Sequence, residues 1–180
     1  MDNLTKIKIS FSDLRHVEDT CKIIPYGIGM VASNTLKHFE DKIEVDLFKD
    51  PADLINYLEQ TIPKIVCFSH YFWNSNLSYE FAKKIKEKSP DTIVIFGGPN
   101  YSISPDEQEA FLLSHPYIDF YVYREGEQAI VDLLKKLFEY NFDIAEIKKL
   151  QLNIPNIHYL SNGKIILGEL APRLTDLDQI

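Results

Sequence analysis

The feature that most constrains the fold is a regular alternation between short apolar segments and segments with helical spacing. Two segments, Ile65–Phe68 and Thr92–Phe96, are almost entirely apolar, as is typical of strands covered on both faces. The strands expected from these patterns are Lys6–Phe11, Ile43–Phe48, Ile65–Phe68, Thr92–Phe96 and Ile118–Val122. Strands that alternate with helices form parallel βαβ units with right-handed crossovers. The sequence therefore predicts an α/β fold, with a doubly wound, flavodoxin- or Rossmann-like five-stranded parallel sheet.

The connecting segments carry helix signals. Apolar residues recur at helical spacing from Ile28 to Phe39, and Asp50-Pro51 is a typical helix start. Leu54, Ile55, Leu58 and Ile62 form the apolar stripe expected for that second helix. Ser75 or Asn76 is a candidate cap for a third helix. Ser104-Pro105-Asp106-Glu107 is a capping box that predicts a short helix to about Leu113, and a long helix is expected to start near Gly126.

The last thirty residues follow a different pattern. Asn162-Gly163 supplies the two residues that a tight hairpin turn requires, so Asn156–Leu160 and Lys164–Leu167 are expected to pair as a small β-hairpin. Glu169–Ile180 has no periodicity and is interpreted as a linker. The expected domains are thus an α/β domain over 1–150 and a hairpin with linker over 151–180.

Charge and cysteine content exclude several classes of protein. The net charge is −8 without any run of Lys or Arg, which argues against a nucleic-acid surface. No apolar run approaches the ~20 residues that span a membrane, so no membrane contact is expected. Cys21 and Cys67 cannot form a metal cluster alone, and they are consistent with the reducing cytoplasm. Cys67, in the middle of a strand, is expected to be inert core.

The predicted fold also predicts where a ligand binds. In open parallel sheets, ligands bind outside the carboxyl ends of the strands, near the point where the strand order reverses. In this chain those ends are Ser12–Lys22, Ser69–Ser75, Gly97–Ser102 and Tyr123–Glu127.

Three of these loops contain candidate site residues, each with an ordinary structural alternative. Tyr71, Phe72 and Trp73 form either a cap on the core or a stacking wall for a flat ligand. Gly97-Gly98 is either a tight turn or a place where a ligand approaches the backbone closely. Asp13 and His16 are either a solvated pair or a metal-binding or acid–base pair. At the fourth loop, Glu125-Gly126-Glu127 begins the last long helix, where acidic residues suit the helix dipole.

Motifs for several other functions are missing. The chain has no GxGxxG after its first strand, no GxxxxGK[ST] loop and no GxSxG elbow. The third strand ends in Phe68-Ser69, without the acceptor Asp of a response-regulator receiver. The first loop also lacks the Ser/Thr-rich phosphate loop of a flavodoxin-like flavin binder.

Four segments together resemble a known family, the N-terminal cobalamin-binding-type domain of cobalamin-dependent radical SAM proteins. They are PYGIGMVAS (25–33), KIVCFSH (64–70), IVIFGGPN (93–100) and YREGEQAI (123–130). The chain's end, LTDLDQI (174–180), is similar to the linker that leads into the radical SAM barrel of that family. The CxxxCxxC motif of the barrel is missing, so the chain is expected to be one domain of a longer enzyme.

The resemblance implies cobalamin as the cofactor, with an open cleft at the strand ends for its nucleotide tail. The residues that it assigns to cofactor binding are Asp13, His16, Ser69, Tyr71, Gly97, Gly98, Pro99, Glu125 and Gly126. Asp13-Leu14-Arg15-His16 departs from the DxHxxG motif that supplies a histidine to cobalt in methionine-synthase-like domains. Base-off cobalamin without a protein histidine ligand is therefore expected, and the chain itself is expected to supply no metal ligand and no catalytic residue.

The resemblance also implies partners and chemistry beyond this chain. A radical SAM domain in cis would carry a 4Fe-4S cluster and S-adenosylmethionine, and the full-length enzyme would perform methyl transfer or radical cyclisation. The alternative is a degenerate, cofactor-free domain that serves as a scaffold or recognises substrate. Tyr71, Phe72 and Trp73 discriminate between the two, because side chains that point into the cleft would occupy the space of the corrin.

Overall fold

A computed structural model describes residues 6–16 and 25–173 of the chain. Within these ranges, seven strands form one sheet in the order β2-β1-β3-β4-β5-β6-β7. The first five strands are parallel, and β6 and β7 are antiparallel to their neighbours. The strands are β1 (Ile7–Ser12), β2 (Ile43–Phe48), β3 (Ile65–Ser69), β4 (Ile93–Gly97), β5 (Phe120–Val122), β6 (Ile157–Ser161) and β7 (Lys164–Leu167). The strand order reverses at β1 and β3, which places a ligand site at their carboxyl ends.

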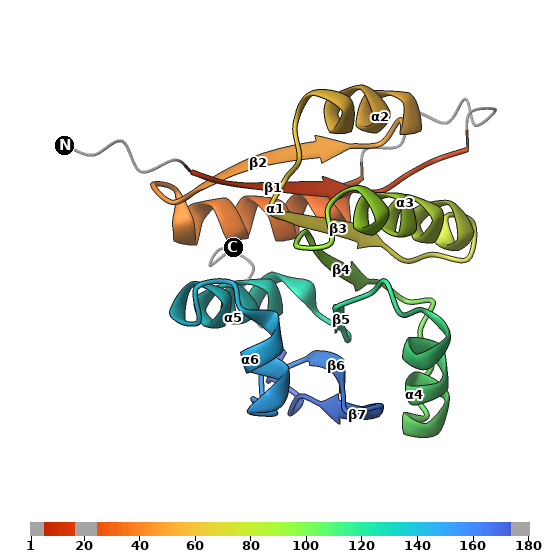
Figure 1. Cartoon of the computed structure of the whole chain (residues 1–180), viewed down its shortest axis with the longest axis vertical. Helices are drawn as coiled ribbons and strands as arrows, with labels where there is room; N and C mark the ends of the chain where they lie inside the picture. Colours follow the sequence, from red (N-terminus) through yellow and green to blue (C-terminus); the bar gives the residue numbers. More distant parts are fainter. Residues whose placement is uncertain (1–5, 17–24, 174–180) are drawn as a thin grey trace.

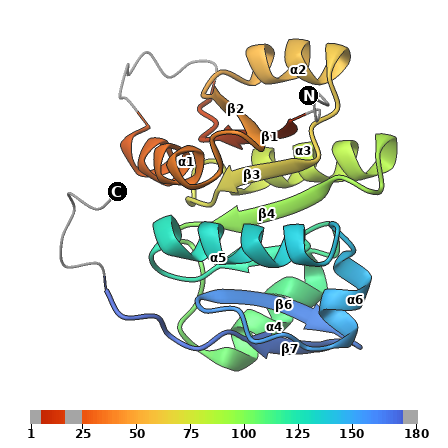
Figure 2. The same ribbon diagram turned by 90° about the vertical axis from the view of Figure 1, so that its left-hand side faces the viewer.

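Helices cover both faces of the sheet. They are α1 (Tyr26–Phe39), α2 (Pro51–Gln60), α3 (Ser75–Lys88), α4 (Pro105–Ser114), α5 (Gly126–Glu139) and α6 (Ile144–Lys149). Figures 1 and 2 show α1 and α5 on one face, and α2, α3 and α4 on the other. Each face has its own core, since the apolar residues of α1, α5 and α6 pack together and those of α2, α3 and α4 form a separate cluster. The doubly wound α/β prediction is confirmed.

The predicted hairpin forms, and it extends the main sheet. Asn162 and Gly163 have φ values of 51° and 75°, as the tight turn requires. Strand β6 pairs with β5 through Tyr121↔His158 and Val122↔Ile157. The structure therefore adds two antiparallel strands to the five parallel strands expected from the sequence.

Several element boundaries differ from the sequence-based predictions for local reasons. Strand β5 begins at Phe120 instead of Ile118, because the Asp119 side chain takes over the pairing with Val94. The capping box at Ser104 is wrong in detail, since its side chain caps nothing and Glu107 accepts a hydrogen bond from Ser102 instead. Helix α1 begins at Tyr26, two residues earlier than expected, and α6 was not predicted.

The apolar stripe predicted for α2 is only partly buried. Leu54 is fully buried, but Ile55 and Ile62 are 46% and 51% exposed. Ile55 and Ile62, together with Leu77 and Phe81 of α3, line an apolar groove of about 380 Å³ between the two helices.

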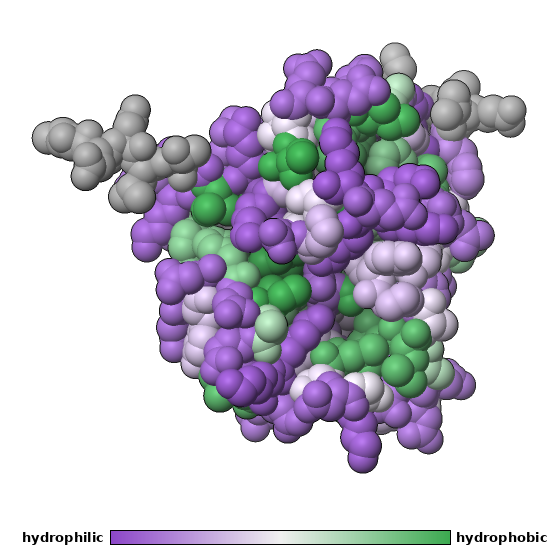
Figure 3. Space-filling model, in the orientation of Figure 1, coloured by the Kyte–Doolittle hydropathy of each residue, from purple (hydrophilic) through white to green (hydrophobic). Residues whose placement is uncertain are grey.

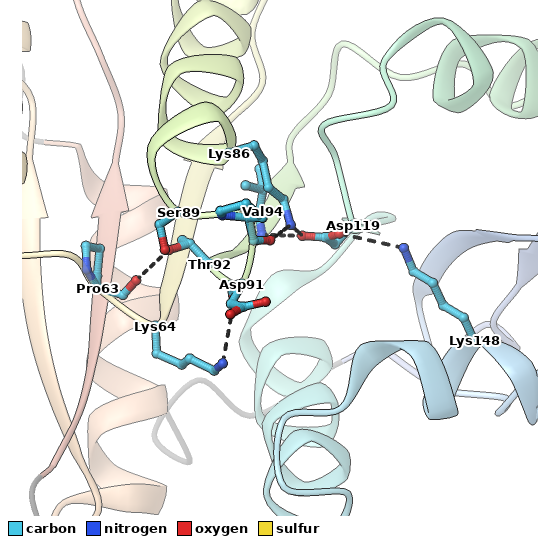
Figure 4. A network of polar contacts seen from close by, with 10 residues as sticks. Pro63, Lys64, Lys86, Ser89, Asp91, Thr92, Val94, Asp119 and Lys148 are labelled. Carbon is cyan, nitrogen blue, oxygen red and sulfur yellow. Dashed lines mark hydrogen bonds and ion pairs between the residues drawn. The ribbon is translucent and has the colours of Figure 1, made fainter.

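A network of charges fastens the amino-terminal edge of the sheet, opposite the predicted ligand site (Figure 4). The Asp119 carboxylate accepts a hydrogen bond from the Val94 backbone at 2.8 Å and pairs with Lys86 Nζ at 2.6 Å. Lys148 Nζ lies 3.7 Å from the other carboxylate oxygen. Desolvation lowers the pKa of Lys148, and Asp119 counteracts that effect. Asp119 thus links β4, α3 and α6.

The surface is mostly polar. On the face shown in Figure 3, hydrophilic side chains predominate and the apolar ones form separate patches. In the described part of the chain, no helix combines the length and apolar character needed to cross a membrane.

Candidate cofactor site

A cavity of about 450 Å³ opens at the carboxyl ends of β1, β3, β4 and β5, between the sheet and helices α1 and α5. Its volume lies in the range typical of small-molecule sites. The inner wall is apolar and is formed by Phe11, Val31, Cys67, Ile95, Val122 and Ile130. The strand-end loops and the start of α1 form the rim. The cavity therefore combines an apolar interior with a rim of polar and backbone groups.

Six of the nine predicted site residues line this cavity: Ser69, Tyr71, Gly97, Gly98, Pro99 and Gly126. Asp13, His16 and Glu125 are not part of the lining. Asp13 nevertheless contacts a lining residue directly. His16 and Glu125 bind elsewhere, as described below, and residues 17–22 of the predicted first loop lie outside the described residues.

Asp13 determines how Ser69 faces the cavity. The Ser69 hydroxyl donates to Asp13 Oδ1 at 2.5 Å and accepts from Asn74 Nδ2 at 3.0 Å. Asn74 Nδ2 also lies 3.2 Å from Asp13 Oδ1, which closes a three-residue network. Because its only proton is used by Asp13, Ser69 offers a ligand an acceptor lone pair and no donor.

His16 does not pair with Asp13. Its Nε2 lies 2.6 Å from the Trp73 backbone carbonyl oxygen. A carbonyl oxygen only accepts hydrogen bonds, so this nitrogen carries the proton and donates. Asp13 thus binds Ser69 and Asn74, and His16 binds the backbone of Trp73, so both residues hold the segment that joins β3 to α3.

The three loop aromatics separate into one residue inside the cavity and two outside it. Tyr71 lines the cavity, and burial together with Asp13 raises the pKa of its hydroxyl. Its ring stacks on Trp73 with centroids 4.4 Å apart. Phe72 is 79% exposed and Trp73 is 45% exposed, and neither lines the cavity. Phe72 and Trp73 therefore do not occupy the cleft.

The glycines of the β4–α4 turn are needed for protein packing. Gly98 has φ +145°, and a Cβ at this position would lie 2.6 Å from the His70 carbonyl oxygen. A Cβ on Gly97 would lie 3.0 Å from that of Val122. The structure thus supports the tight-turn interpretation of Gly97-Gly98. At Gly27, in contrast, an added Cβ would meet only the Tyr71 hydroxyl, at 4.0 Å, so here the backbone faces open space.

Residues 123–125 connect β5 to α5 at the rim of the cavity. Glu125 is the N-cap residue of α5, and it pairs with Arg173 at 2.6 Å. Arg124 adopts a positive φ of 67° and lines the cavity. The ion pair between Glu125 and Arg173 places the segment that follows β7 beside the start of α5.

Sequence reasoning missed several lining residues, notably Gly27, Ile28, Tyr101, Tyr123 and Arg124. Gly27 lies in the PYGIG segment that contributed to the family resemblance. The sequence distance between this segment and the loop after the third strand was the signal that could have identified Gly27 as a site residue. Tyr101 had no signal, since its position depends on stacking against Tyr121 at 3.7 Å. Within residues 6–16 and 25–173, its buried hydroxyl has no hydrogen-bond partner.

The cavity wall contains no reactive thiol. Cys67 is buried, and desolvation raises the pKa of its thiol well above its ordinary range. The prediction that Cys67 is inert core is therefore supported. Among the described residues, no group of three or more His, Cys, Asp or Glu side chains is placed to hold a metal ion.

The strand order, the cavity at the strand ends and the apolar inner wall define a doubly wound ligand-binding domain of the flavodoxin-like type. Comparison with known proteins identifies the family. Residues 21–134 match the family model described as "B12 binding domain". The chain belongs to this family, as the sequence resemblance predicted.

Two curated relatives are methyltransferases. The chain is 34% identical over 92 residues to 2-(S-pantetheinyl)-carbapenam-3-carboxylate methyltransferase of Streptantibioticus cattleyicolor, covering 48% of this chain and 13% of that protein. It is 27% identical over 135 residues to the cobalamin-dependent radical SAM methyltransferase TokK of Streptomyces tokunonensis, covering 72% of this chain and 18% of TokK. The chain thus spans less than a fifth of either relative.

A solved structure shares the fold. The cobalamin-dependent S-adenosylmethionine radical enzyme OxsB, solved with aqua-cobalamin and S-adenosylmethionine bound, superposes with a TM-score of 0.71 at 21% identity. The match covers 94% of this chain and 23% of OxsB. The chain therefore resembles the cobalamin domain of radical SAM enzymes in both sequence and fold.

Proposed function

We propose that the chain binds cobalamin with the nucleotide tail in the cavity and the corrin outside the carboxyl edge of the sheet. The observation that carries this proposal is the coincidence of the family match with the cavity. Residues 21–134 include every helix and strand that forms the cavity wall except β1. The apolar inner wall suits a flat aromatic group at the end of the tail.

The residues present fit such a cofactor. The open space at Gly27 lets the tail approach the backbone of α1, and Ser69 would accept a hydrogen bond from it. The buried hydroxyl of Tyr101, which has no hydrogen-bond partner among the described residues, suits a polar group of the ligand. Gly97, Gly98, Pro99, Tyr71 and Gly126 would complete the walls, while Asp13 would act through Ser69.

We further propose that the bound cofactor is base-off and has no histidine ligand from the protein. The DxHxxG motif is missing, and His16 Nε2 donates a hydrogen bond to the Trp73 carbonyl. A donor nitrogen has no lone pair for cobalt, so Nε2 of His16 is not available as a ligand and only Nδ1 of that ring retains a lone pair.

The proposed context is a larger radical SAM enzyme in the cytoplasm. The support is the small share of each relative that this chain spans, and the buried unpaired thiol of Cys67 suits a reducing compartment. A radical SAM domain in cis would hold the 4Fe-4S cluster and S-adenosylmethionine. Bound cobalamin would supply a cobalt centre for methyl transfer or radical cyclisation. The role of this chain would be to bind and orient.

The test is a titration of hydroxocobalamin and methylcobalamin into the purified chain, followed by absorbance and calorimetry. Saturable binding is expected. Gly27→Phe would fill the cavity and should weaken binding more than tenfold. Gly29→Phe is the matched control, since Gly29 lies outside the lining and its Cβ would have no neighbour within 4 Å.

Each result has a clear meaning. Equal binding by both variants would place the ligand elsewhere, and no binding by the unmodified chain would favour the cofactor-free scaffold. For the base-off proposal, the bound cob(II)alamin should lack nitrogen superhyperfine splitting in its electron paramagnetic resonance spectrum. Splitting that changes on ¹⁵N-histidine labelling would contradict it.

A further inference from the structure

His70 lies directly behind the cavity, and the sequence analysis assigned it no role. It follows Ser69 at the end of β3 and is 1% exposed. It does not line the cavity, but its backbone binds the β4–α4 turn at two points. The His70 N–H donates to the Gly97 carbonyl at 2.7 Å, and the His70 carbonyl accepts from the Asn100 N–H at 3.1 Å.

The imidazole reaches the same turn through two side chains. Nδ1 lies 2.8 Å from the Tyr121 hydroxyl, which in turn donates to the Gly98 carbonyl at 3.2 Å. Nε2 lies 2.9 Å from the Ser75 hydroxyl and 3.1 Å from Asn100 Nδ2. The ring is therefore connected to both ends of the turn.

The chemistry of these partners favours one position for the ring proton, and the Ser75 hydroxyl can accompany it because a hydroxyl can donate to Nε2. The Gly98 carbonyl only accepts, so the Tyr121 hydroxyl donates its one proton to that carbonyl and must accept a hydrogen bond from Nδ1. At the other end, the Asn100 amide nitrogen only donates, so Nε2 must accept. Both ends agree on a neutral imidazole protonated at Nδ1. Burial, and secondarily the nearby His115, lowers the pKa of His70 to about 4, which keeps the ring neutral near pH 7.

The turn requires such a restraint. Gly98 has φ +145° and no side chain of its own to hold it, and glycine has the widest conformational freedom of any residue. Gly97, Gly98 and Pro99 all line the cavity, so movement of the turn would change the shape of the rim.

We propose that His70, as the Nδ1-protonated neutral tautomer, is a positioning residue that holds the Gly97–Asn100 turn in its ligand-binding conformation through Tyr121 and Asn100. This inference rests on the proposed function in so far as the ligand is cobalamin. The restraint itself is a property of the cofactor-free protein and can be tested there.

The first measurement is the ¹⁵N spectrum of the histidine rings in the cofactor-free chain. His70 should show a protonated Nδ1 and an unprotonated Nε2 near pH 7. The reverse assignment would overturn the proposal whether or not the chain binds cobalamin.

The second measurement compares variants in hydroxocobalamin titration and in amide hydrogen exchange. Tyr121→Phe keeps the ring stacked on Tyr101 and removes only the hydroxyl that joins His70 Nδ1 to the Gly98 carbonyl, so it should weaken binding about tenfold and speed exchange of the Asn100 amide. Tyr159→Phe is the matched control, because it removes a similarly buried hydroxyl bonded to the Leu152 carbonyl, away from the turn. This control should leave both binding and Asn100 exchange unchanged.

Substitution of His70 itself completes the test. His70→Leu should weaken binding at least as much as Tyr121→Phe, whereas His70→Asn, which keeps an N–H near the position of Nδ1, should restore part of the affinity. Unchanged affinity in Tyr121→Phe and His70→Leu, with the unmodified chain binding, would refute the positioning role and leave the proposed function intact. If the unmodified chain does not bind, the proposed function fails, and the tautomer and the exchange rates still decide the restraint.

Discussion

Ser69 presents only an acceptor to the cavity, because Asp13 takes its proton and Asn74 donates to its oxygen. Asp13→Asn would remove the charge that holds this arrangement while keeping the size of the side chain. We expect it to weaken cobalamin binding about tenfold, the scale of one hydrogen bond to a charged group. Absorbance titration measures the effect. Asp132→Asn, which removes a carboxylate with two partners on α5, is the control and should bind as the unmodified chain does.

Gly98 tests whether the turn depends on glycine. Gly98→Ala would place a Cβ against the His70 carbonyl at a φ of +145°, which costs on the order of 2 kcal/mol in the free energy of unfolding. Gly29→Ala should instead stabilise the protein by about 0.5–1 kcal/mol, since it lies in a helix with open space around it. Urea denaturation compares the two. Equal stability of Gly98→Ala and the unmodified chain would contradict the turn geometry.

At the scale of elements, Asp119 links β4, α3 and α6 through the Val94 amide, Lys86 and Lys148. Asp119→Asn would leave two half-buried ammonium groups without their counter-charge. We expect a loss of about 3 kcal/mol in the free energy of unfolding. Glu87→Gln breaks an exposed pair with Lys84 and should leave the free energy of unfolding nearly unchanged. Similar costs for the two substitutions would show that the network does not hold these elements together.

The same elements show what the sequence can predict. The buried strands at Ile65–Phe68 and Thr92–Phe96 were predictable because burial on both faces leaves a continuous apolar run. The start of β5 was not predictable, because it depends on Asp119 meeting Val94, a residue 25 positions away. The capping box predicted for α4 was wrong because the Glu107 carboxylate accepts a hydrogen bond from Ser102, which lies outside the expected box.

The candidate site divides in the same way. The four strand-end loops were predictable from the fold alone, since parallel strands bring their carboxyl ends together. Tyr101 was missed because only its stacking on Tyr121 places it at the cavity. The glycine pair was recognised, but the nearest neighbour of Gly98, the His70 backbone, follows another strand and leaves no local signal.

At the scale of the whole molecule, two buried histidines make stability depend on pH. Burial lowers the pKa of His70 and of His158 from 6.5 to about 4. Between these pH values the unfolded chain binds protons that the folded chain does not. The contribution of the two neutral histidines to the free energy of unfolding is therefore fully present above about pH 6.5 and decreases as the pH falls toward 4. The urea midpoint should decrease over this window.

His158→Phe isolates one of these contributions. In the part of the chain that the structure describes, His158 Nδ1 has no hydrogen-bond partner, and its ring packs against Tyr101 and Tyr123, so phenylalanine suits the site. We expect unchanged or higher stability at pH 7 and a shallower decrease toward pH 4. The same slope in both proteins would show that His158 does not titrate in this window.

The proposed binding mode places the tail of cobalamin in the cavity between α1 and the ends of β3, β4 and β5. The most direct measurement is a crystal structure of the chain with hydroxocobalamin. We expect the nucleotide tail between Gly27 and the Gly97–Gly98 turn, with Ser69 accepting a hydrogen bond from the ligand and no histidine on the cobalt. A cofactor bound on another face, or a histidine of this chain on the cobalt, would contradict it.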